Sequence, residues 1–458
     1  MGNQILEIAA SALAAARQAM DVNAQNVANA QTPGYIRQRA VLAPVPLGDP
    51  QGRVGVGNGV MVAAVERLRN QCLEAQLNHQ EGQLGEAEAR ADSLSRVQSA
   101  FSDLNGDGIS EALGAFFDAI EEVQTAPASS AARDQVIFAA DTFAQRMRET
   151  SAALVQEQQT VAQGLEQHVA EVNRLLGQVA ELNARIMPLG DNPQAGDLKV
   201  TREQAIRELA TLCGATGLDQ PDGSQDVLLG GLRLVQGSHV TELALAADPA
   251  DATRQIVTVG NVSEPDSLGG QIAGCLAARD QYDQWRQELD DLAATFAGAC
   301  NTTHRAGYDL NSQSGGDMFT YDATAPAGSL HVAATLEDHP EALALSGTLT
   351  GPPGDVTNAQ NLLSLREGRL FAGGTQTAEE TYREIVASVG REMQRATDAR
   401  DARQQLVDAL DTQYAAEAGV SLDEEAVEVM RLQQVYNAAI RLVKIADTMM
   451  QEVLGLAG

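Results

Sequence analysis

The sequence predicts a mainly α-helical protein with β-rich insertions, organised as an elongated, multidomain chain. Aromatic residues make up only 3% of the chain although hydrophobic residues reach 44%, and this balance suits helix packing better than an aromatic pocket. Residues 130–187 carry one long helical pattern, and both ends of the chain carry apolar stripes at helical spacing. Residues 213–263 instead collect Gly, Asp and β-branched residues in short runs typical of strands. We therefore expect the N- and C-terminal helices to pair as a coiled-coil stem, with small β-rich modules facing outward.

The first predicted helix covers residues 4–30, and its apolar residues alternate by three and four, the spacing of a coiled-coil seam. Pro33 and Gly34 end this helix, because Pro cannot continue a helix and Gly allows a turn. Residues 40–60 are rich in Pro and Gly and are expected to form an extended loop or strand. The predicted seam consists of Ile5, Ile8, Ala12, Ala15, Ala19 and Val22.

The middle of the chain alternates between helical patterns and Gly-rich segments. The long helix predicted over 130–187 would span about 85 Å at 1.5 Å per residue, and rods of this length are typical of coiled coils. Residues 307–360 are rich in Gly, Ser, Thr and Pro, so they predict a second, β or irregular insertion. Further helices are expected over residues 66–101, 110–125 and 271–304.

Two helices close the chain, and Gly419 separates them. Thr377 and Ser421 each begin a Ser/Thr-x-x-Glu pattern, which predicts a capping box at the start of each helix. In the last helix the apolar residues form a seam of three heptads, although a helix buried within one chain shows the same stripe. The seam residues are Val429, Leu432, Tyr436, Ala439, Val443, Ala446, Met450 and Val453.

These patterns predict a nested domain organisation. The terminal helical stem comprises residues 1–45 and 411–458, and a long-helix domain comprises 46–210, 269–306 and 361–410. A β-rich module covers residues 211–268, and the smaller β or irregular insertion covers 307–360.

The formal net charge of −31 argues against two classes of partner. Nucleic acid needs a basic surface, and an anionic membrane attracts basic segments, so neither partner is expected. No apolar run approaches the roughly 20 residues of a membrane-spanning helix, and the N-terminus lacks the pattern of a cleavable secretory signal. The first 69 residues are slightly basic and residues 411–458 are acidic, which favours pairing of the two ends.

The sequence contains no arrangement of residues that predicts catalysis, a cofactor, a metal site or a small-molecule substrate. The four cysteines are far apart, and the six histidines form no His-x-x-x-His pair. Residues 103–109 imitate a calcium-binding loop, but Gly114 stands where a bidentate Glu is needed. An adhesin or hydrolase activity in the insertions at 213–263 or 307–360 remains an alternative.

The most specific motif lies at the end of the first helix. It resembles the N-terminal signature of the bacterial flagellar axial proteins, the family of rod, hook and hook-associated proteins. Local structure alone also explains some of it, because Asn ends helices well and a Tyr often packs in a core. The motif residues are Asn26, Ala28, Asn29, Thr32, Gly34, Tyr35, Arg37 and Gln38.

Other segments resemble the hook-associated members of this family in the same order along the chain. The run Gly-Tyr-x-Arg-Gln at 34–38 is similar to the corresponding run of the hook–filament junction proteins, with Ile36 in place of the usual Ser. Leu422 lies in a C-terminal run, Gly-Val-Ser-Leu-Asp-Glu-Glu, that is similar to another family block. Further similar segments begin at Gly57, Ala180, Thr201, Ala306, Gln433 and Ala446.

The resemblance implies a structural, non-enzymatic protein that joins hook to filament in the extracellular bacterial flagellum. It implies export from the cytoplasm through the flagellar type III apparatus and assembly through the terminal helices. The implied partners are other copies of the chain in a ring, the hook protein, the second junction protein and a chaperone on the C-terminal helix. The motif residues, Leu422 and the seam residues are the expected assembly residues, and another rod, hook or junction role remains the alternative within the family.

Overall fold

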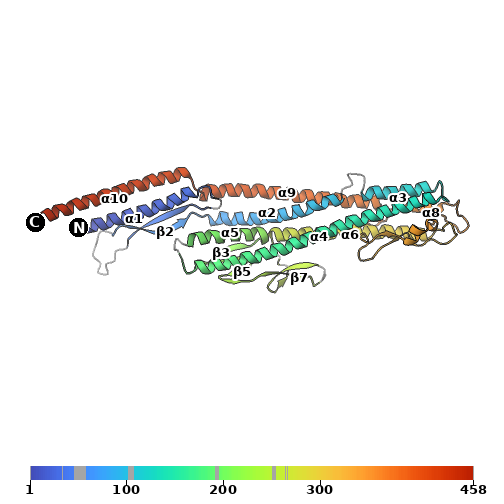
Figure 1. The fold of residues 1–458 in the computed structure, drawn as a ribbon, viewed down its shortest axis with the longest axis horizontal. Coiled ribbons are helices and arrows are strands. Elements are labelled where there is room, and N and C mark those ends of the chain that lie inside the picture. The colour runs from blue at the N-terminus through green and yellow to red at the C-terminus, as the bar shows by residue number, and fades with distance from the viewer. Residues whose placement is uncertain are drawn as a thin grey trace. The chain divides into compact units, whose positions relative to one another are not determined.

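The computed structural model describes residues 2–32, 35–45, 58–101, 108–190, 195–249, 254–263, 265 and 267–456. In these residues the chain is mainly helical with small antiparallel sheets, so the predicted fold class is confirmed (Figure 1). The chain forms two compact units, and helices α2, α4 and α9 contribute residues to both. The first unit comprises Met1–Leu84, Ala170–Gly270 and Ala402–Gly458, and the second comprises Gly85–Val169 and Gln271–Asp401.

The two ends of the chain meet in the first unit. Helix α1 (Gly2–Ala28) and helix α10 (Leu422–Leu456) lie side by side, and strands β1 (Gln38–Pro44) and β2 (Val60–Arg67) form an antiparallel ribbon against α1 (Figure 1). The helix predicted to begin at residue 66 instead begins at Gln71, with three residues between it and the end of β2, as α2 (Gln71–Val97). The prediction was wrong because the β-branched run of β2 pairs with β1 as far as Arg67.

Two long helices and a shorter one organise the rest of the first unit. Helix α4 (Ser130–Ile186) confirms the long helix predicted over 130–187, and it ends just before Pro188. Helix α5 (Gly196–Cys213) ends at Gly214, whose φ of 75° is left-handed and favours glycine. The last turns of α9 (Ala378–Ala418) pack an apolar side chain, Val407, against leucines of α2.

The β-rich part of the first unit contains two antiparallel sheets with strand orders β3-β4-β5-β6 and β7-β8-β9. The strands are β3 (Thr216–Asp219), β4 (Gln225–Leu229), β5 (Leu232–Gln236), β6 (His239–Val240), β7 (Leu243–Ala247), β8 (Gln255–Val259) and β9 (Val262–Ser263).

A buried asparagine of α4 holds the first of these sheets. Asn183 is completely buried, and its Nδ2 donates to the carbonyl oxygens of Gln225 at 2.9 Å and Gly237 at 2.8 Å. Its Oδ1 accepts from the Gln225 amide at 3.0 Å and from Arg202 Nη1 at 2.8 Å. Because three of these four bonds go to main-chain groups of Gln225 and Gly237, Asn183 fixes the sheet on the end of α4.

The second unit concentrates most of the few aromatic residues in one core. Phe116, Phe143, Phe296 and Phe319 are buried, and their ring centroids lie 5.1 to 6.3 Å apart in mainly edge-to-face pairs. They come from α3, α4, α6 and β10. The elements of this unit not yet given are η1 (Gln98–Phe101), α3 (Ile109–Val123), α6 (Gly270–Arg305), β10 (Phe319–Thr320), β11 (His331–Val332), α7 (Ala334–Asp338), η3 (Pro340–Ala342) and α8 (Thr357–Ser364).

A buried histidine connects α6 to the irregular segment that follows it. His304 Nδ1 donates to the Gly316 carbonyl at 2.8 Å, and the Ala344 amide donates to His304 Nε2 at 2.9 Å. Both ring nitrogens are satisfied only by the neutral imidazole, because the protonated ring has no acceptor. Burial lowers the pKa of His304, which is consistent with this neutral form.

The capping predictions differ in outcome between the last two helices. At the start of α9 the Thr377 amide donates to Glu380 Oε2 at 2.9 Å and the Glu380 amide donates to Thr377 Oγ1 at 3.2 Å, so the capping box is confirmed. At the start of α10 only one half forms, with the Glu424 amide 3.5 Å from Ser421 Oγ. The side chain of Glu424 instead binds an arginine of the terminal stem.

Candidate assembly site

The contact between α1 and α10 uses one apolar face of each helix. On α10, Leu432, Ala439 and Ala446 are buried. The predicted seam residues Val429, Tyr436, Val443 and Met450 are half-buried, and Val453 belongs to α10 although its side chain is outside the described part. On α1 the seam residues are all buried or half-buried: Ile5, Ile8, Ala12, Ala15, Ala19 and Val22.

Asn26 lies at the centre of a hydrogen-bond network that joins α1, β1 and α10. It is completely buried, and its Oδ1 accepts from the Gln38 amide and from the Tyr35 hydroxyl, each at 3.0 Å. Its Nδ2 donates to the Gln38 carbonyl at 2.8 Å and to Glu425 Oε2 at 3.2 Å. Burial and the nearby charge of Glu425 raise the pKa of Tyr35, which keeps its hydroxyl a donor. The network therefore ties segments from both ends of the chain together.

Arg37 supplies the positive charge of this network. Its Nε donates to Glu425 Oε1 at 2.6 Å, and its Nη1 donates to Glu424. Glu425 is only 1% exposed, so its carboxylate needs both Arg37 and Asn26 as partners. Burial alone would lower the pKa of Arg37, but the bonds and charges of the two glutamates outweigh burial and raise it. The Arg37 amide also donates to the Ala418 carbonyl at 3.0 Å, which fixes the end of α9 beside β1.

The other predicted motif residues are more peripheral. Asn29 Nδ2 donates to the Gln25 carbonyl at 2.9 Å, and Thr32 Oγ1 donates to Asn29 Oδ1 at 3.2 Å, so both residues close the end of α1 locally. Ala28 and Leu422 are exposed. Gly34 lies outside the described residues.

Sequence reasoning missed Glu425 as a member of the site. The residue stands in the C-terminal run that carries Leu422, but no local pattern shows that its partner is almost 400 positions earlier. A weak signal was available, because Glu425 falls four residues before Val429, on the face of the helix that carries the seam.

Ion pairs anchor the end of β2 to the helices of the same unit. Arg67 Nη1 donates to Glu203 Oε1 at 2.9 Å, and Arg69 Nη1 lies 2.9 Å from the same oxygen. Arg69 also pairs with Glu74 of α2 at 2.8 Å. These side chains are mostly buried, so the cluster holds the ribbon against α2 and α5.

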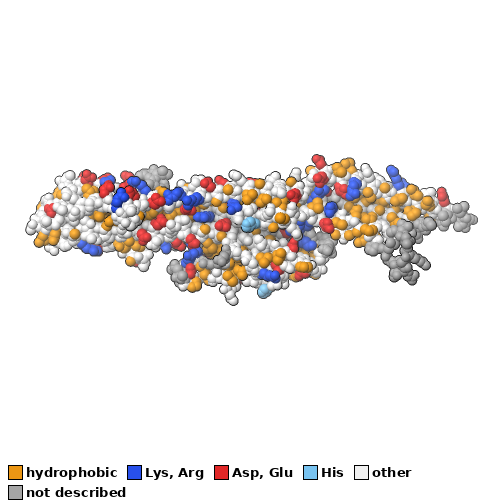
Figure 2. All heavy atoms as spheres, turned by 180° about the vertical axis from the view of Figure 1, so that it is seen from behind, with side chains coloured by type: hydrophobic (Ala, Val, Ile, Leu, Met, Phe, Trp, Pro, Cys, Tyr) orange, Lys and Arg blue, Asp and Glu red, His pale blue; other side chains and the backbone are white. Residues whose placement is uncertain are grey.

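A second apolar stripe runs along α10 outside its contact with α1. Its residues are 43% to 61% exposed, and Figure 2 shows hydrophobic side chains gathered over the terminal helices. Large exposed apolar patches on a protein surface mark interaction sites. The stripe consists of Val427, Met430, Val435, Leu442, Ile445 and Met449.

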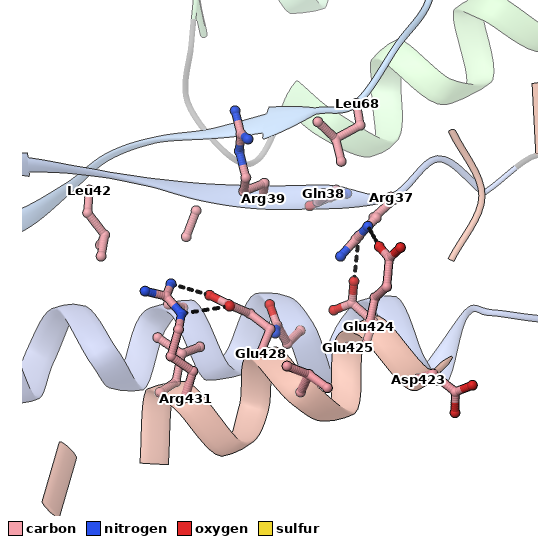
Figure 3. Close-up of a pocket in the computed structure, with 15 residues that line it drawn as sticks. Arg37, Gln38, Arg39, Leu42, Leu68, Asp423, Glu424, Glu425, Glu428 and Arg431 are labelled. Atoms are coloured by element: carbon pink, nitrogen blue, oxygen red, sulfur yellow. Dashed lines mark hydrogen bonds and ion pairs between the residues drawn. The ribbon is translucent and has the colours of Figure 1, made fainter. Parts of the chain in front are cut away.

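A groove of about 550 Å³ lies between β1 and α10 (Figure 3). Arg39 and Leu42 of β1 form one wall, and Val427 and Arg431 of α10 form the other. Arg431 Nε donates to Glu428 Oε2 at 2.8 Å, so its charge is paired within the helix.

The described residues form neither a cluster of metal-ligating side chains nor a helix that could span a membrane. In the described part of the chain, His, Cys, Asp and Glu side chains form no group of three that could hold a metal ion. Among the same residues no helix combines the length and apolarity needed to cross a bilayer. The calcium-like run at 103–109 lies largely outside the described residues, as 102–107 are not among them.

Three family models match this chain. Residues 94–319 match the flagellar hook-associated protein FlgK helical domain, residues 6–35 match the flagella basal body rod protein, and residues 412–456 match the C-terminal part of the flagellar basal body rod FlgEFG proteins. The range 6–35 contains the predicted motif as far as Tyr35, and the range 412–456 contains the seam of α10. The fold and these matches show that the chain is similar to the bacterial flagellar axial proteins.

Individual relatives narrow this class. The flagellar hook-associated protein 1 of Bacillus subtilis is 28% identical over 99% of this chain and 98% of its own length. The Escherichia coli protein of the same name is 24% identical over 99% of this chain and 100% of its own length. The solved flagellar hook junction protein FlgK from Burkholderia pseudomallei has the same fold, with a TM-score of 0.66 and 16% identity over 74% of this chain and 99% of the other. The chain is thus similar to flagellar hook-associated protein 1 over nearly the whole length of both relatives, and the family resemblance drawn from its two ends is confirmed.

Proposed function

We propose that this chain is a structural subunit of the extracellular flagellum that joins hook to filament. The observation that carries the proposal is the stripe of large apolar residues on α10 that α1 leaves exposed. A protein that worked alone would leave this stripe in water, whereas a subunit of an assembly covers it with neighbours. The full-length relatives are named for their association with the hook, which supports the same role.

The proposed partners follow from the two faces of α10. The inner face pairs with α1 of the same chain, and the outer stripe is free for other copies in a ring, for the hook protein and for the second junction protein. Before export an uncovered stripe invites premature association, so a cytoplasmic chaperone on α10 belongs to the proposal, as does export through the flagellar type III apparatus. Asn26, Arg37 and Glu425 hold the stem in the shape that these partners meet. No catalytic role is proposed for any residue.

Deletion of the gene in its host tests this proposal. Electron microscopy of the cells and an assay of filament protein in the medium should show hooks without filaments and filament protein shed into the medium. Cells with neither hook nor filament would instead support a rod or hook role, and normal flagella would refute a structural role in the flagellum.

A complementation experiment links the phenotype to the stripe. The intact chain should restore filaments, whereas Ile445→Asp should not, because a charge within the stripe opposes burial by a neighbour. The matched control is Arg441→Asp, a charge change on the same helix at a polar position. Equal complementation by Ile445→Asp and the intact chain would contradict a role for the stripe.

A further inference from the structure

The β1–β2 ribbon has two outer edges that no further strand of the described residues covers. Its two strands form a sheet of their own, and no third strand of the described residues joins it. The Arg37 carbonyl accepts from the Leu68 amide at 2.9 Å, and the Val45 amide donates to the Gly59 carbonyl at 3.0 Å. Odd-numbered residues from 37 to 45 therefore turn their main-chain groups toward β2, and even-numbered residues turn them away, because these directions alternate along a strand.

Helix α1 covers each edge of the ribbon at one end only. On β1, Asn26 binds both the amide and the carbonyl of Gln38. On β2, Ser11 Oγ accepts from the Val60 amide at 3.2 Å. Within the described residues no hydrogen bond occupies the outward main-chain groups of Ala40 and Leu42 on β1 or of Val62 and Val65 on β2. One open stretch is thus left on each strand.

The open stretch of β1 faces the groove against α10 (Figure 3). Asn23 of α1 also lines this groove, and it is only 6% exposed while its Nδ2 has no partner. A buried donor without a partner is costly, and a carbonyl oxygen brought into the groove would satisfy it. On the opposite wall Val427 is 61% exposed, so an inserted segment would also bury apolar surface.

We propose that β2 of a second copy adds to the open edge of β1 in this groove, so that the ribbons of neighbouring copies form one continuous antiparallel sheet. The proposal rests on the proposed function, since it requires that copies assemble. It names the surface by which they do so in addition to the stripe of α10.

The charge pattern of the two strands selects this occupant and its register. In the ribbon Arg39 lies opposite Glu66, with 3.6 Å between Arg39 Nη2 and Glu66 Oε2, and the two side chains are 63% and 55% exposed. A second β2 in the same register on the outer edge would place another Glu66 opposite Arg39 and another Val65 opposite Ala40. A slip of one residue would place Arg39 opposite Arg67, and like charges directly opposite are destabilising.

The same register also satisfies the main chain. Within the ribbon Ala40 lies opposite Val65, and the main-chain N–H and C=O groups of both residues point to the outer edges. When Ala40 of one copy lies opposite Val65 of another across these outer edges, the same groups point toward each other and can form hydrogen bonds. Each copy then uses its β1 edge for one neighbour and its β2 edge for the other. Such a head-to-tail contact closes into a ring or continues as a helix, and it leaves no open edge between neighbours.

Cysteine cross-linking between copies tests the register. Two chains, both carrying Cys72→Ser, would be expressed together in a host that lacks the native gene, one with Val41→Cys and the other with Ala64→Cys. Across copies this pair lies directly opposite in the closely spaced, non-hydrogen-bonded arrangement, which suits a disulfide. Mild oxidation of isolated flagella should produce covalent dimers, and flagella with only the Val41→Cys chain should produce none.

The alternative outcomes separate this proposal from the proposed function. Chains that assemble into flagella and restore filaments without mixed dimers would overturn the strand pairing and leave the junction role standing. The same would follow if a mispaired combination, Val41→Cys with Met61→Cys, cross-linked equally well. Absence of the chain from flagella would overturn the junction role and the strand pairing with it.

A proline variant provides a second test without cysteines. Ala40→Pro removes an outward amide and no hydrogen bond of the ribbon itself, whereas the control Ala40→Ser keeps the amide. Both free chains should have the same melting temperature, and incorporation of Ala40→Pro into flagella should fall at least tenfold relative to Ala40→Ser. Equal incorporation of the two variants would overturn the proposal.

Discussion

Replacement of Asn26 by Ala should loosen the terminal stem. Its side-chain amide makes four hydrogen bonds: it accepts from the Gln38 amide and the Tyr35 hydroxyl, and it donates to the Gln38 carbonyl and to Glu425. A neutral bond contributes about 0.5 to 1.5 kcal/mol and a bond to a charged group about 1.5 to 3 kcal/mol. Because Tyr35 and Gln38 are half-buried and can regain water, the low end applies, and we expect a loss of about 3 kcal/mol in stem stability.

Hydrogen exchange measures this loss directly. The amides of Arg37 and Leu68 are suitable reporters, because they bind main-chain carbonyls and keep their partners in the variant. A loss of about 3 kcal/mol corresponds to a roughly hundredfold faster exchange of these amides, if the stem opens as a unit. The same loss should lower the denaturant midpoint of the stem without a change elsewhere.

The matched control is Asn29→Ala, three residues later in the same motif. Among the described residues the side chain of Asn29 binds only Gln25 and Thr32, both near the surface, so its loss should cost well under 1 kcal/mol. Asn26→Asp should be as damaging as Asn26→Ala, because it places a second carboxylate where Nδ2 now meets Glu425. Equal exchange rates for Asn26→Ala and Asn29→Ala would refute the view that Asn26 organises the stem.

Three further predictions concern other parts of the chain. Ala439→Asp should separate α10 from α1 because it places a charge in their buried contact, whereas Leu442→Asp on the exposed stripe should leave the melting curve of the free chain unchanged. A calorimetric melting temperature that falls more for Leu442→Asp than for Ala439→Asp would contradict the assigned faces. The second unit should lose stability as the pH falls below about 6.5, because the pKa of His304 is lowered in the folded chain and the unfolded chain therefore takes up a proton first. Urea unfolding of the intact chain should show lower stability at pH 5.0 than at pH 7.5, and His304→Gln should reduce this difference. In the folded chain only Cys72 should react rapidly with a thiol reagent, because the other three cysteines are buried and burial raises the pKa of each. Mass spectrometry after brief labelling should find one modified thiol. Labelling of Cys300 at a rate similar to that of Cys72 would contradict this.

The helices could be predicted from the sequence because their signals are local. Apolar residues at spacings of three and four specify both a helix and its buried face, and Ala439 and Val443 lie on that face of α10 as the spacing indicates. The start of α2 could not be predicted in the same way. Residues 66–70 carry no helix-breaking residue, and only the pairing of Arg67 with Gln38 in the ribbon decides that the strand continues.

The partners within the stem could not be predicted for a different reason. Asn26 and Glu425 are polar residues that ordinarily lie at the surface, and their burial is favourable because they bind each other and partners elsewhere in the stem, such as Arg37. A single sequence shows that Asn26 lies near the end of one helix and Glu425 near the start of another. These local roles account for both residues, so the sequence gives no reason to expect the long-range contact between them. The exposed stripe of α10 was hidden similarly, because α10 is apolar on two faces and periodicity does not say which face pairs within the chain.

Stem stability and assembly should be separable by comparing variants of Asn26 and Ala40. Asn26 fills one end of the β1 edge, so it fixes how the remaining open stretch at Ala40 meets the groove. Loss of Asn26 should therefore weaken the stem and the contact between copies together, because both depend on the orientation of β1. Loss of the Ala40 amide should affect the contact between copies alone, because the ribbon does not use that amide. If the changes at Asn26 and Ala40 lowered stem stability equally, the Ala40 amide would be needed for the fold of the single chain. If only the change at Asn26 lowers it, the outer edge of β1 serves the contact with a second copy.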